Sequence, residues 1–474
     1  MTKNPEDAFL RNLTGGKVFM IGIGGCSMSG LALLLKVRGY DVLGSSSIET
    51  EYLPTLREHG IRVSMQDDPA LLEDVGLLVY SHAVSMDNPL ILAAKRNGIP
   101  VLSRSWLLGQ ISEEYSRAIC VCGTHGKTTV TSMLAQILIG AGLDPTVHIG
   151  GIFPPMGGNV RNGNSDLFLT EACEYQRSFL SLSPTGIVLM NIEAEHLDCY
   201  RDVDEIEETF GAFLGKLPED GWALGFGEDE RVLNRLRRLP RRTAAFGMSC
   251  NCAYRMENVS EDPFGYFCFD YFHDAEKLGH VRMGIPGRFN AVNAAAALAA
   301  AHMLGVNMSA ACESIERFRG AHRRFELTGT MNGAEIFHDY GHNPTEMKNA
   351  VSIARKRCQR GRLWAVMQPN NFIRVKELFQ DYLTCTKQAD ITLVTDIYGD
   401  RTKDPGGISS EMLVEGMRGQ GICAVSTPEL LDAAALLRER VQPGDLVITM
   451  GGGDIYLLNE LLKEPDKRRT HESR

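Results

Sequence analysis

The chain has 474 residues, 44% of them hydrophobic and 23% charged, a globular composition large enough for about two to four domains. Its net charge of −10 argues against a nucleic-acid-binding protein, which normally has a basic face, although local loops can still bind a phosphate-rich ligand. No stretch approaches the ~18 apolar residues of a membrane span, residues 1–12 contain no apolar signal segment, and the twelve cysteines follow neither a disulfide nor a zinc pattern. We therefore expect a cytoplasmic protein with reduced thiols that binds neither nucleic acid nor membrane.

The first predicted segment, residues 1–114, alternates strands with helices, which predicts a parallel sheet covered by helices. A glycine-rich turn containing Gly22, Gly24 and Gly25 follows the first strand. The main-chain amides of such a turn, at the start of a helix, can bind an anion. Apolar runs predict strands at 17–21, 41–43 and 77–80 and a helix at 31–37.

The second predicted segment, residues 115–322, begins with a strand, a short glycine loop and an apolar helix. The loop reads Gly123-Thr124-His125-Gly126-Lys127-Thr128-Thr129 and ends like a Walker A loop, but Val121 stands where that pattern needs its first glycine. The strand–loop–helix setting still predicts a phosphate site. The other predicted elements are strands at 118–122, 167–170 and 186–190, helices at 130–139 and 291–304, and an antiparallel excursion between 247 and 283.

Two residues that follow strands of the second segment complete a predicted metal site. Glu171 comes after the strand ending at residue 170, and His196 lies a few residues beyond the strand ending at 190. Ligands of a doubly wound sheet sit beyond the carboxyl ends of its strands, so both side chains can face the Thr128 hydroxyl. This set predicts Mg²⁺ held against the phosphates of ATP, with Lys127 at the β- and γ-phosphates.

The third predicted segment, residues 323–474, repeats the α/β pattern. Its predicted strands are 363–367, 391–395 and 446–450, with helical runs between them. The chain as a whole therefore predicts three successive α/β units.

These motifs together resemble those of the Mur ligases, the ATP-dependent amide-forming enzymes of bacterial cell-wall precursor synthesis. Within that family the order and spacing are most similar to those of the members that join L-alanine to UDP-N-acetylmuramate. The matching stretches are 22–30, 87–89, 123–129, 171–174, 191–196, 290–293, 323–325, 339–342, 368–374 and 450–454.

The resemblance implies a three-domain α/β fold and a reaction. A Rossmann-like N-terminal domain (1–114) would bind the UDP substrate, a central P-loop ATPase-like domain (115–322) would bind ATP, and a Rossmann-like C-terminal domain (323–474) would complete the ligase. The muramic acid carboxylate would attack the γ-phosphate of ATP, and the amine of L-alanine would displace phosphate from the acyl phosphate. We expect a monomer or weak homodimer.

The resemblance also implies which residues form each site. The implied ATP site comprises Gly123, Thr124, His125, Gly126, Lys127, Thr128, Thr129, Asn290, Asn293, Arg324 and Asp339. The implied substrate site comprises Gly22, Gly24, Gly25, Ser27, Ser81, Glu174, Tyr340, His342 and Arg374. The implied Mg²⁺ ligands are Thr128, Glu171 and His196, and the implied catalytic residues are Lys127, Glu171, His196, Arg324 and His342.

Several positions depart from the usual residues of the family, mostly where the substrate is expected. They are Ser27, Ser46, His82, Cys173, Met190, Phe289, His338, Asn343, Asn370 and Asn371.

Three other interpretations remain. A dinucleotide-binding oxidoreductase would use the first glycine turn, but Ser27 replaces its third glycine and no acidic residue ends the second strand. A related Mur-type ligase would add another amino acid or a peptide to a UDP-muramyl substrate. A degenerate ligase retained as a binding subunit would be expected to have lost Lys127, Glu171 or Arg324, all of which are present.

Overall fold

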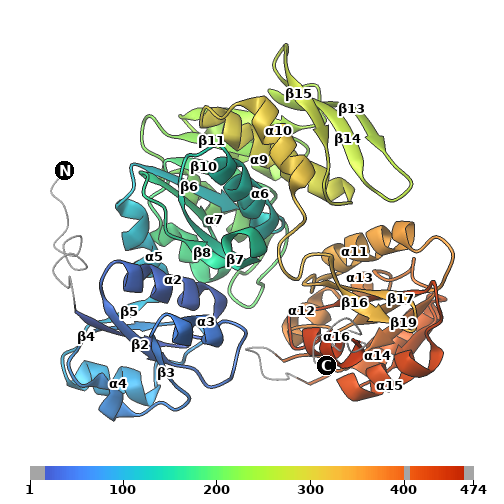
Figure 1. Ribbon diagram of the computed structural model, residues 1–474, viewed down its shortest axis with the longest axis horizontal. Helices are drawn as coiled ribbons and strands as arrows, with labels where there is room; N and C mark the ends of the chain where they lie inside the picture. Colours follow the sequence, from blue (N-terminus) through green and yellow to red (C-terminus); the bar gives the residue numbers. More distant parts are fainter. Residues whose placement is uncertain (1–15, 400–405, 464–474) are drawn as a thin grey trace, which may run out of the picture.

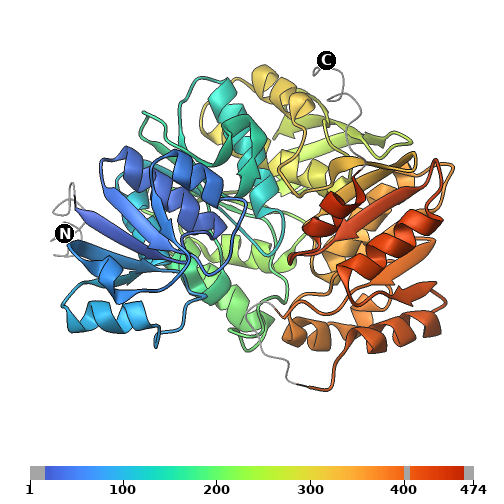
Figure 2. The same ribbon diagram turned by 60° about the horizontal axis from the view of Figure 1, so that its bottom comes forward.

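The computed structural model describes residues 16–399 and 406–463, whose strands form three sheets in chain order (Figure 1). The first and third sheets, with their helices, flank the second in both ribbon views (Figure 2). We call the three groups the first, central and third lobes. None of the described helices has the length and apolar character needed to cross a membrane. Residues 1–12, for which the sequence predicts no signal segment, lie outside the described part.

The first lobe is a five-stranded parallel sheet of order β3-β2-β1-β4-β5. Val18, Phe19 and Met20 of the first strand are completely buried, as expected for a parallel strand covered on both faces. Its elements are β1 (Lys17–Ile21), α2 (Cys26–Val37), β2 (Asp41–Ser45), α3 (Leu53–Glu58), β3 (Arg62–Ser64), η2 (Pro69–Leu72), β4 (Val75–Tyr80), α4 (Pro89–Arg96), β5 (Val101–Ser103) and α5 (Arg104–Glu113).

The central lobe is a ten-stranded sheet of order β15-β14-β13-β12-β11-β10-β6-β9-β7-β8. Its middle strands are parallel, while β13, β14 and β15 form the predicted antiparallel excursion. Its elements are β6 (Arg117–Cys122), α6 (Lys127–Gly140), β7 (Thr146–Phe153), η3 (Pro154–Met156), β8 (Gly158–Arg161), β9 (Leu167–Glu171), η4 (Tyr175–Ser181), β10 (Gly186–Leu189), α7 (Val203–Leu214), β11 (Trp222–Phe226), α8 (Glu230–Arg238), β12 (Arg242–Gly247), β13 (Tyr254–Glu261), β14 (Phe267–His273), β15 (Glu276–Arg282), α9 (Arg288–Met303) and α10 (Met308–Arg317).

Helix α9 lies against α6 at the centre of the largest hydrophobic core. Eight alanines of α9, from Ala291 to Ala301, are completely buried. Small side chains on both faces allow the helix to pack closely between the sheet and its neighbours. This packing fixes the start of α6, and therefore the loop before it.

The third lobe is a six-stranded sheet of order β16-β17-β21-β18-β19-β20, parallel except for the β16–β17 pair. Its carboxyl edge faces the central lobe through residues that contact each other across the boundary. Its elements are β16 (Glu326–Met331), β17 (Ala334–Asp339), α11 (Pro344–Arg357), β18 (Leu363–Met367), α12 (Phe372–Glu377), α13 (Phe379–Tyr382), β19 (Ile391–Val394), α14 (Ser410–Gly419), β20 (Ala424–Ser426), α15 (Leu430–Arg440), β21 (Leu446–Met450) and α16 (Tyr456–Leu462).

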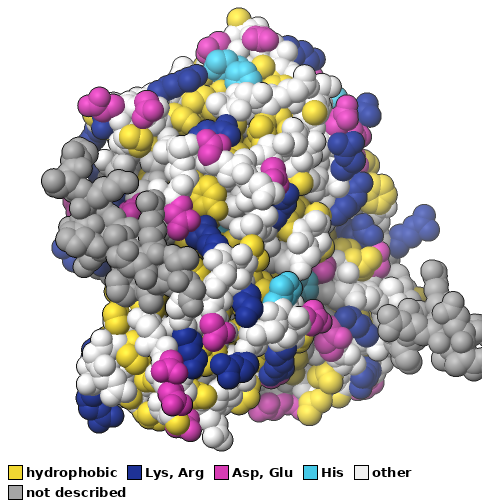
Figure 3. Space-filling model, turned by 60° about the vertical axis from the view of Figure 1, so that its left-hand side comes forward, with side chains coloured by type: hydrophobic (Ala, Val, Ile, Leu, Met, Phe, Trp, Pro, Cys, Tyr) yellow, Lys and Arg dark blue, Asp and Glu magenta, His cyan; other side chains and the backbone are white. Residues whose placement is uncertain are grey.

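Two features of the described residues relate to the expectations from composition: the state of the cysteines and the distribution of surface charge. All twelve cysteines lie in the described part and are free thiols, as the sequence predicts. On the face that Figure 3 shows, acidic and basic side chains are interspersed, and they do not gather into one basic patch. A basic patch is the electrostatic signature of a nucleic-acid-binding surface.

Candidate active site

Two adjoining cavities lie where the lobes meet. The smaller, of about 230 Å³, lies between the phosphate loop, α9 and the start of the third lobe. The larger, of about 390 Å³, reaches from the glycine turn of the first lobe to the third lobe. Both cavities are lined by His125, Gly126, Thr128, Arg324 and Glu346. The arrangement can therefore place a ligand of one cavity against a ligand of the other.

The phosphate loop occupies the turn between β6 and α6, where the sequence predicts it. Gly126 has φ +86°, and a Cβ there would lie 2.6 Å from Oδ1 of Asn293 in α9. Only glycine fits both constraints. The loop is held from the other side by Asn191, whose Oδ1 accepts the His125 amide at 2.7 Å. The loop amides at the start of α6 are therefore available to bind an anion.

Lys127 is paired with a buried carboxylate. Its Nζ lies 3.0 Å from Oε1 and 2.9 Å from Oε2 of Glu174, whose side chain is 2% exposed. Burial favours the neutral acid, but Lys127 and His196 lower the pKa of Glu174 to about 2. Glu174 was expected to bind substrate. It is not among the residues that line the larger cavity, so its place is beneath Lys127.

Two of the three predicted metal ligands are neighbours. Thr128 Oγ1 lies 3.3 Å from Glu171 Oε2, and both residues line the larger cavity. Burial raises the pKa of Glu171, although the Gly150 amide donates to its Oε1 at 2.7 Å. A partly buried carboxylate beside a hydroxyl suits a hard cation, so this pair fits Mg²⁺.

His196 is placed differently from the other two predicted ligands. Its Nε2 contacts Glu174 Oε1 at 3.5 Å, although it lines the same cavity as Glu171. Within the described ranges no three His, Cys, Asp or Glu side chains converge as a metal cluster. A cation at Thr128 and Glu171 would therefore need further ligands from phosphate or water, as Mg²⁺ commonly has.

The smaller cavity ends at helix α9. Asn290 Nδ2 donates to the Pro286 carbonyl at 2.7 Å, and Asn293 Nδ2 donates to Asn290 Oδ1 at 3.3 Å. Phe289, which is 38% exposed, lines the same cavity. The two asparagines thus shape the loop and helix around an apolar recess that can accept a flat ring.

The third lobe contributes Arg324 to both cavities, whereas Arg374, which was expected at the substrate, lines neither of them. Arg324 Nη2 lies 3.5 Å from Thr128 Oγ1, and its guanidinium stacks over Tyr340. Arg374 Nη2 lies 2.6 Å from Oε1 of Glu195, and both side chains are nearly buried. Burial favours the neutral form of Glu195, but Arg374 lowers its pKa.

His342 and Asp339 sit near these arginines, at the end of β17. Burial, and then the charge of Arg374, lower the pKa of His342 below its usual value. Burial raises the pKa of Asp339, whose oxygens accept the amides of Phe325 and Gly341. His342 is therefore favoured as a neutral imidazole, while Asp339 shapes the turn that presents Tyr340.

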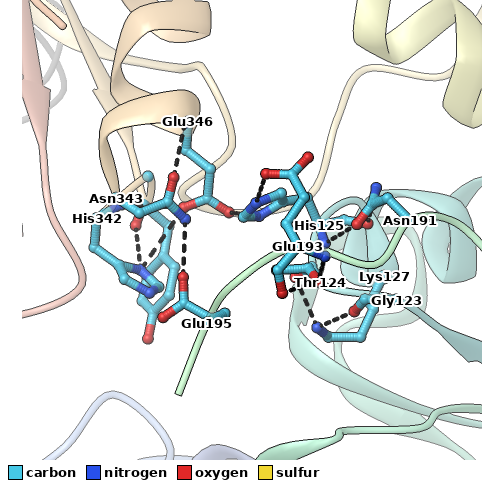
Figure 4. A network of polar contacts seen from close by, with 12 residues as sticks. Gly123, Thr124, His125, Lys127, Asn191, Glu193, Glu195, His342, Asn343 and Glu346 are labelled. Carbon is cyan, nitrogen blue, oxygen red and sulfur yellow. Dashed lines mark hydrogen bonds and ion pairs between the residues drawn. The ribbon is translucent and has the colours of Figure 1, made fainter. Parts of the chain in front are cut away.

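Three carboxylates of the site were missed from the sequence: Glu193, Glu195 and Glu346 (Figure 4). His125 lies between two of them, with Nε2 3.3 Å from Glu193 and Nδ1 3.2 Å from Glu346. Burial opposes a charge on His125, but these two partners raise its pKa to about 10. The Asn343-x-x-Glu346 pattern is a helix N-cap signature that marks Glu346, because Asn343 Oδ1 accepts the Glu346 amide.

The first lobe reaches the larger cavity with Gly25, Ser27, Ser81 and the unpredicted Arg104. Arg104 Nη1 donates to Ser27 Oγ at 3.0 Å. Gly22 and Gly24 were expected at the ligand but lie behind this lining; Gly22 has φ +75°, and an added Cβ there would be 3.3 Å from Ser81 Cβ. Their part is to allow the tight turn.

Comparisons with known proteins identify the same family over most of the chain. Three family models match in order: "Mur ligase family, catalytic domain" at residues 17–116, "Mur ligase middle domain" at 121–301 and "Mur ligase, glutamate ligase domain" at 323–453. The chain is 39% identical to a UDP-N-acetylmuramate–L-alanine ligase of Acetivibrio thermocellus, over 94% of this chain and 95% of the relative. It is 37% identical to the Clostridium beijerinckii enzyme of the same name, over 94% and 96%.

Two solved structures have similar folds. The UDP-N-acetylmuramate–alanine ligase of Thermotoga maritima matches with TM-score 0.82 and 25% identity, covering 97% of this chain and all of that one. A murein peptide ligase of Psychrobacter arcticus matches with TM-score 0.74 and 24% identity, covering 94% and 98%. At 24% identity, the likeness to the murein peptide ligase shows a shared fold and no more.

Proposed function

We propose that this chain, which belongs to the Mur ligase family, joins L-alanine to the carboxylate of UDP-N-acetylmuramate, using ATP and releasing ADP and phosphate, in peptidoglycan precursor synthesis. The observation that carries the proposal is the pair of adjoining cavities that share Arg324 and Thr128. One cavity fits a nucleotide and the other a larger polar ligand. Curated relatives that bear this activity in their names, over nearly their whole length, support the choice of substrates.

Each of the three lobes would have a separate role in the reaction. Residues 1–114 would hold the UDP substrate at Gly25, Ser27, Ser81 and Arg104. Residues 115–322 would hold ATP, with the adenine against α9 and the phosphates at the loop before α6. Residues 323–474 would bring Arg324, His342 and Arg374 to the reacting groups.

The chemistry needs cations because two anions must meet. A carboxylate is a poor electrophile at neutral pH, and attack on the γ-phosphate of ATP turns it into an acyl phosphate with a good leaving group. Lys127 and Arg324 would stabilise the charge that develops on the transferred phosphoryl group. Bound Mg²⁺ would neutralise phosphate charge and would be held by Thr128 and Glu171, with His196 nearby. All five residues line the larger cavity.

The second step is attack by the amine of L-alanine on the acyl carbon. The guanidinium of Arg374 would suit the amino-acid carboxylate if it exchanged Glu195 for the substrate, because a planar fork of donors matches two oxygens. His342, which is favoured as a neutral imidazole and lines the larger cavity, would accept the proton that the amine must lose. The lobes must exclude water in the meantime, because water would hydrolyse the acyl phosphate.

We also propose a location in the cell and an assembly state for the enzyme. An ATP requirement fits a cytoplasmic enzyme, and a monomer or weak homodimer would bring all the named residues together within one chain. Sedimentation of the purified protein with and without substrates would measure the assembly state.

The test is phosphate release from ATP by the purified protein. We expect release only when UDP-N-acetylmuramate, Mg²⁺ and L-alanine are all present, with a muramyl-alanine product identified by mass. Parallel reactions with L-serine, glycine and an alanine-led tripeptide distinguish the related ligase activities. Turnover that needs NAD(H) and not ATP, or product formed only with the tripeptide, would overturn the proposal.

A further inference from the structure

One histidine outside the described machinery contacts all three lobes. The main-chain N–H of His322 donates to the Ile152 carbonyl of β7 in the central lobe at 2.9 Å. Its Nε2 lies 3.2 Å from Oε2 of Glu51 in the first lobe, and its Nδ1 lies 2.7 Å from Oε2 of Glu326 in β16 of the third lobe. Two ring nitrogens that each face a carboxylate both act as donors, which requires the imidazolium.

The charges around His322 favour that form. Hydrogen bonds that His322 donates to Glu326 and Glu51 raise its pKa to about 9. The charge of Arg323 helps to lower the pKa of Glu51, and the charge of Lys463 helps to lower the pKa of Glu326. His338 also faces this group, but burial and Arg323 lower its pKa to about 3, so it adds no charge at neutral pH. The side chains of His322, Glu51 and Glu326 are each about one-third exposed or less, so solvent can reach them.

The first-lobe partner belongs to the loop that supports the glycine turn. Thr50, next to Glu51, donates its hydroxyl to the Gly24 carbonyl at 2.9 Å. Ser46, at the other end of this loop, lies so close that a Cβ on Gly24 would be 2.7 Å from its Oγ. A ligand that orders the glycine turn therefore also orders Glu51.

The third-lobe partner supports the peptide that aims Arg324. Glu326 Oε2 also accepts the Arg323 amide at 2.8 Å. Arg323 and Phe325, on either side of Arg324, have φ of +61° and +45°. Side chains rarely adopt such values, and they persist only where surrounding contacts impose them. The Arg323 carbonyl then accepts the Tyr340 amide at 2.7 Å, which places Tyr340 under Arg324.

We propose that His322 is a positioning residue, a clasp between Glu51 and Glu326 that couples occupancy of the first-lobe substrate site to the orientation of Arg324 in the nucleotide cavity. The identity of the two ligands rests on the proposed function. The clasp lies outside both cavities, and His322 touches neither ligand site directly. Its loss should leave each single-ligand affinity nearly intact and remove the dependence of one on the other.

Calorimetry on the full chain at pH 7 tests this proposal. A non-hydrolysable ATP analogue with Mg²⁺ is titrated into the protein with and without saturating UDP-N-acetylmuramate. We expect the wild type to bind the analogue at least about 5-fold more tightly with the muramyl nucleotide present, a typical size for coupled sites. In His322→Gln and in Glu51→Gln the ratio should fall to within about 2-fold of one, and the double variant should add nothing further.

His280→Gln is the matched control, because His280 also pairs with a carboxylate, Asp270 at 2.9 Å, but lies on the distant β15. It should keep the wild-type ratio. A wild-type ratio retained in both clasp variants, or a wild type that binds both ligands without coupling, would overturn the clasp and leave the ligase proposal standing. A wild type that does not bind UDP-N-acetylmuramate would instead refute the ligase proposal, and the clasp with it.

Discussion

Nδ1 of His125, in the phosphate loop, lies 3.2 Å from Oε1 of Glu346, in the first turn of α11. This contact joins the central lobe to the third lobe at the point where both cavities meet. Because Glu346 Oε2 also accepts the His342 amide at 3.1 Å, the phosphate loop is connected to the loop that carries His342. The nucleotide side and the acceptor side of the site are thus held in one charged network.

This contact predicts an alkaline loss of stability. The pKa of His125 rises from 6.5 to about 10 on folding, so its stabilising effect is complete below about pH 6.5 and disappears as the pH rises through 10. The melting temperature of His125→Gln should lie several degrees below the wild type at pH 6, and the gap should close by about pH 10.5. Thermal melts in steps of half a pH unit measure it, and a gap that stays constant across this range would contradict the charged state.

Lys127 and Glu174 predict a separation of stability from activity. Lys127→Met leaves Glu174 buried with only the more distant His196 beside it, which should cost about 3–5 kcal/mol of unfolding free energy. Adding Glu174→Gln removes the buried negative charge, so the double variant should regain most of the melting temperature that Lys127→Met loses. Its turnover should remain at least about 100-fold below the wild type, because the cation at the phosphates is still missing. Activity that returns together with stability would exclude the catalytic role.

Gly126 predicts a steric block at the phosphate loop. Gly126→Ala combines φ +86° with a Cβ 2.6 Å from Asn293, so it should lower the affinity for the ATP analogue at least about 10-fold and destabilise the protein by about 1–3 kcal/mol. Gly142→Ala is the control, since Gly142 has a similar φ of +74° but open space around it. Equal effects of the two variants on nucleotide binding would show that general destabilisation, and not the contact with α9, is responsible.

The metal pair predicts a graded Mg²⁺ dependence. Glu171→Gln should raise the Mg²⁺ concentration for half-maximal turnover by about 10-fold or more, since it removes a charged oxygen ligand beside Thr128. His196→Ala should raise it less, because His196 contacts Glu174. Chelation with EDTA should abolish turnover in all three proteins, and Mg²⁺ should restore it. An unchanged Mg²⁺ requirement in His196→Ala would remove that residue from the metal site.

The fold class was accessible from the sequence, and the three-lobed Mur ligase architecture is confirmed. Strands 17–21, 363–367 and 446–450 match β1, β18 and β21, because parallel strands buried on both faces are continuous apolar runs. The starts of α2 and α6 were predicted too late. Their first turns, at Cys26 and Lys127, belong to ligand loops and lack the apolar periodicity that marks a helix.

The candidate site was only partly accessible. Motif residues within one lobe, such as Lys127 and Thr128, fall where the sequence places them, because a strand and a helix fix the loop between them. Glu195 and Glu346 acquire their roles from partners in another lobe, Arg374 and His125. No local pattern encodes which carboxylate will meet which cation across a lobe boundary, so these pairs emerge only from the tertiary structure.

The buried carboxylate under Lys127 has a further kinetic consequence. A lysine whose charge is matched by Glu174 at about 3 Å presents little net field beyond the loop, and the chain as a whole carries −10. A nucleotide that approaches from solution is therefore not drawn in by long-range attraction, and it meets the cation only on contact. The association rate of ATP should consequently not fall as the ionic strength rises, because there is no long-range attraction for salt to screen, so that recognition is decided after encounter and not during it.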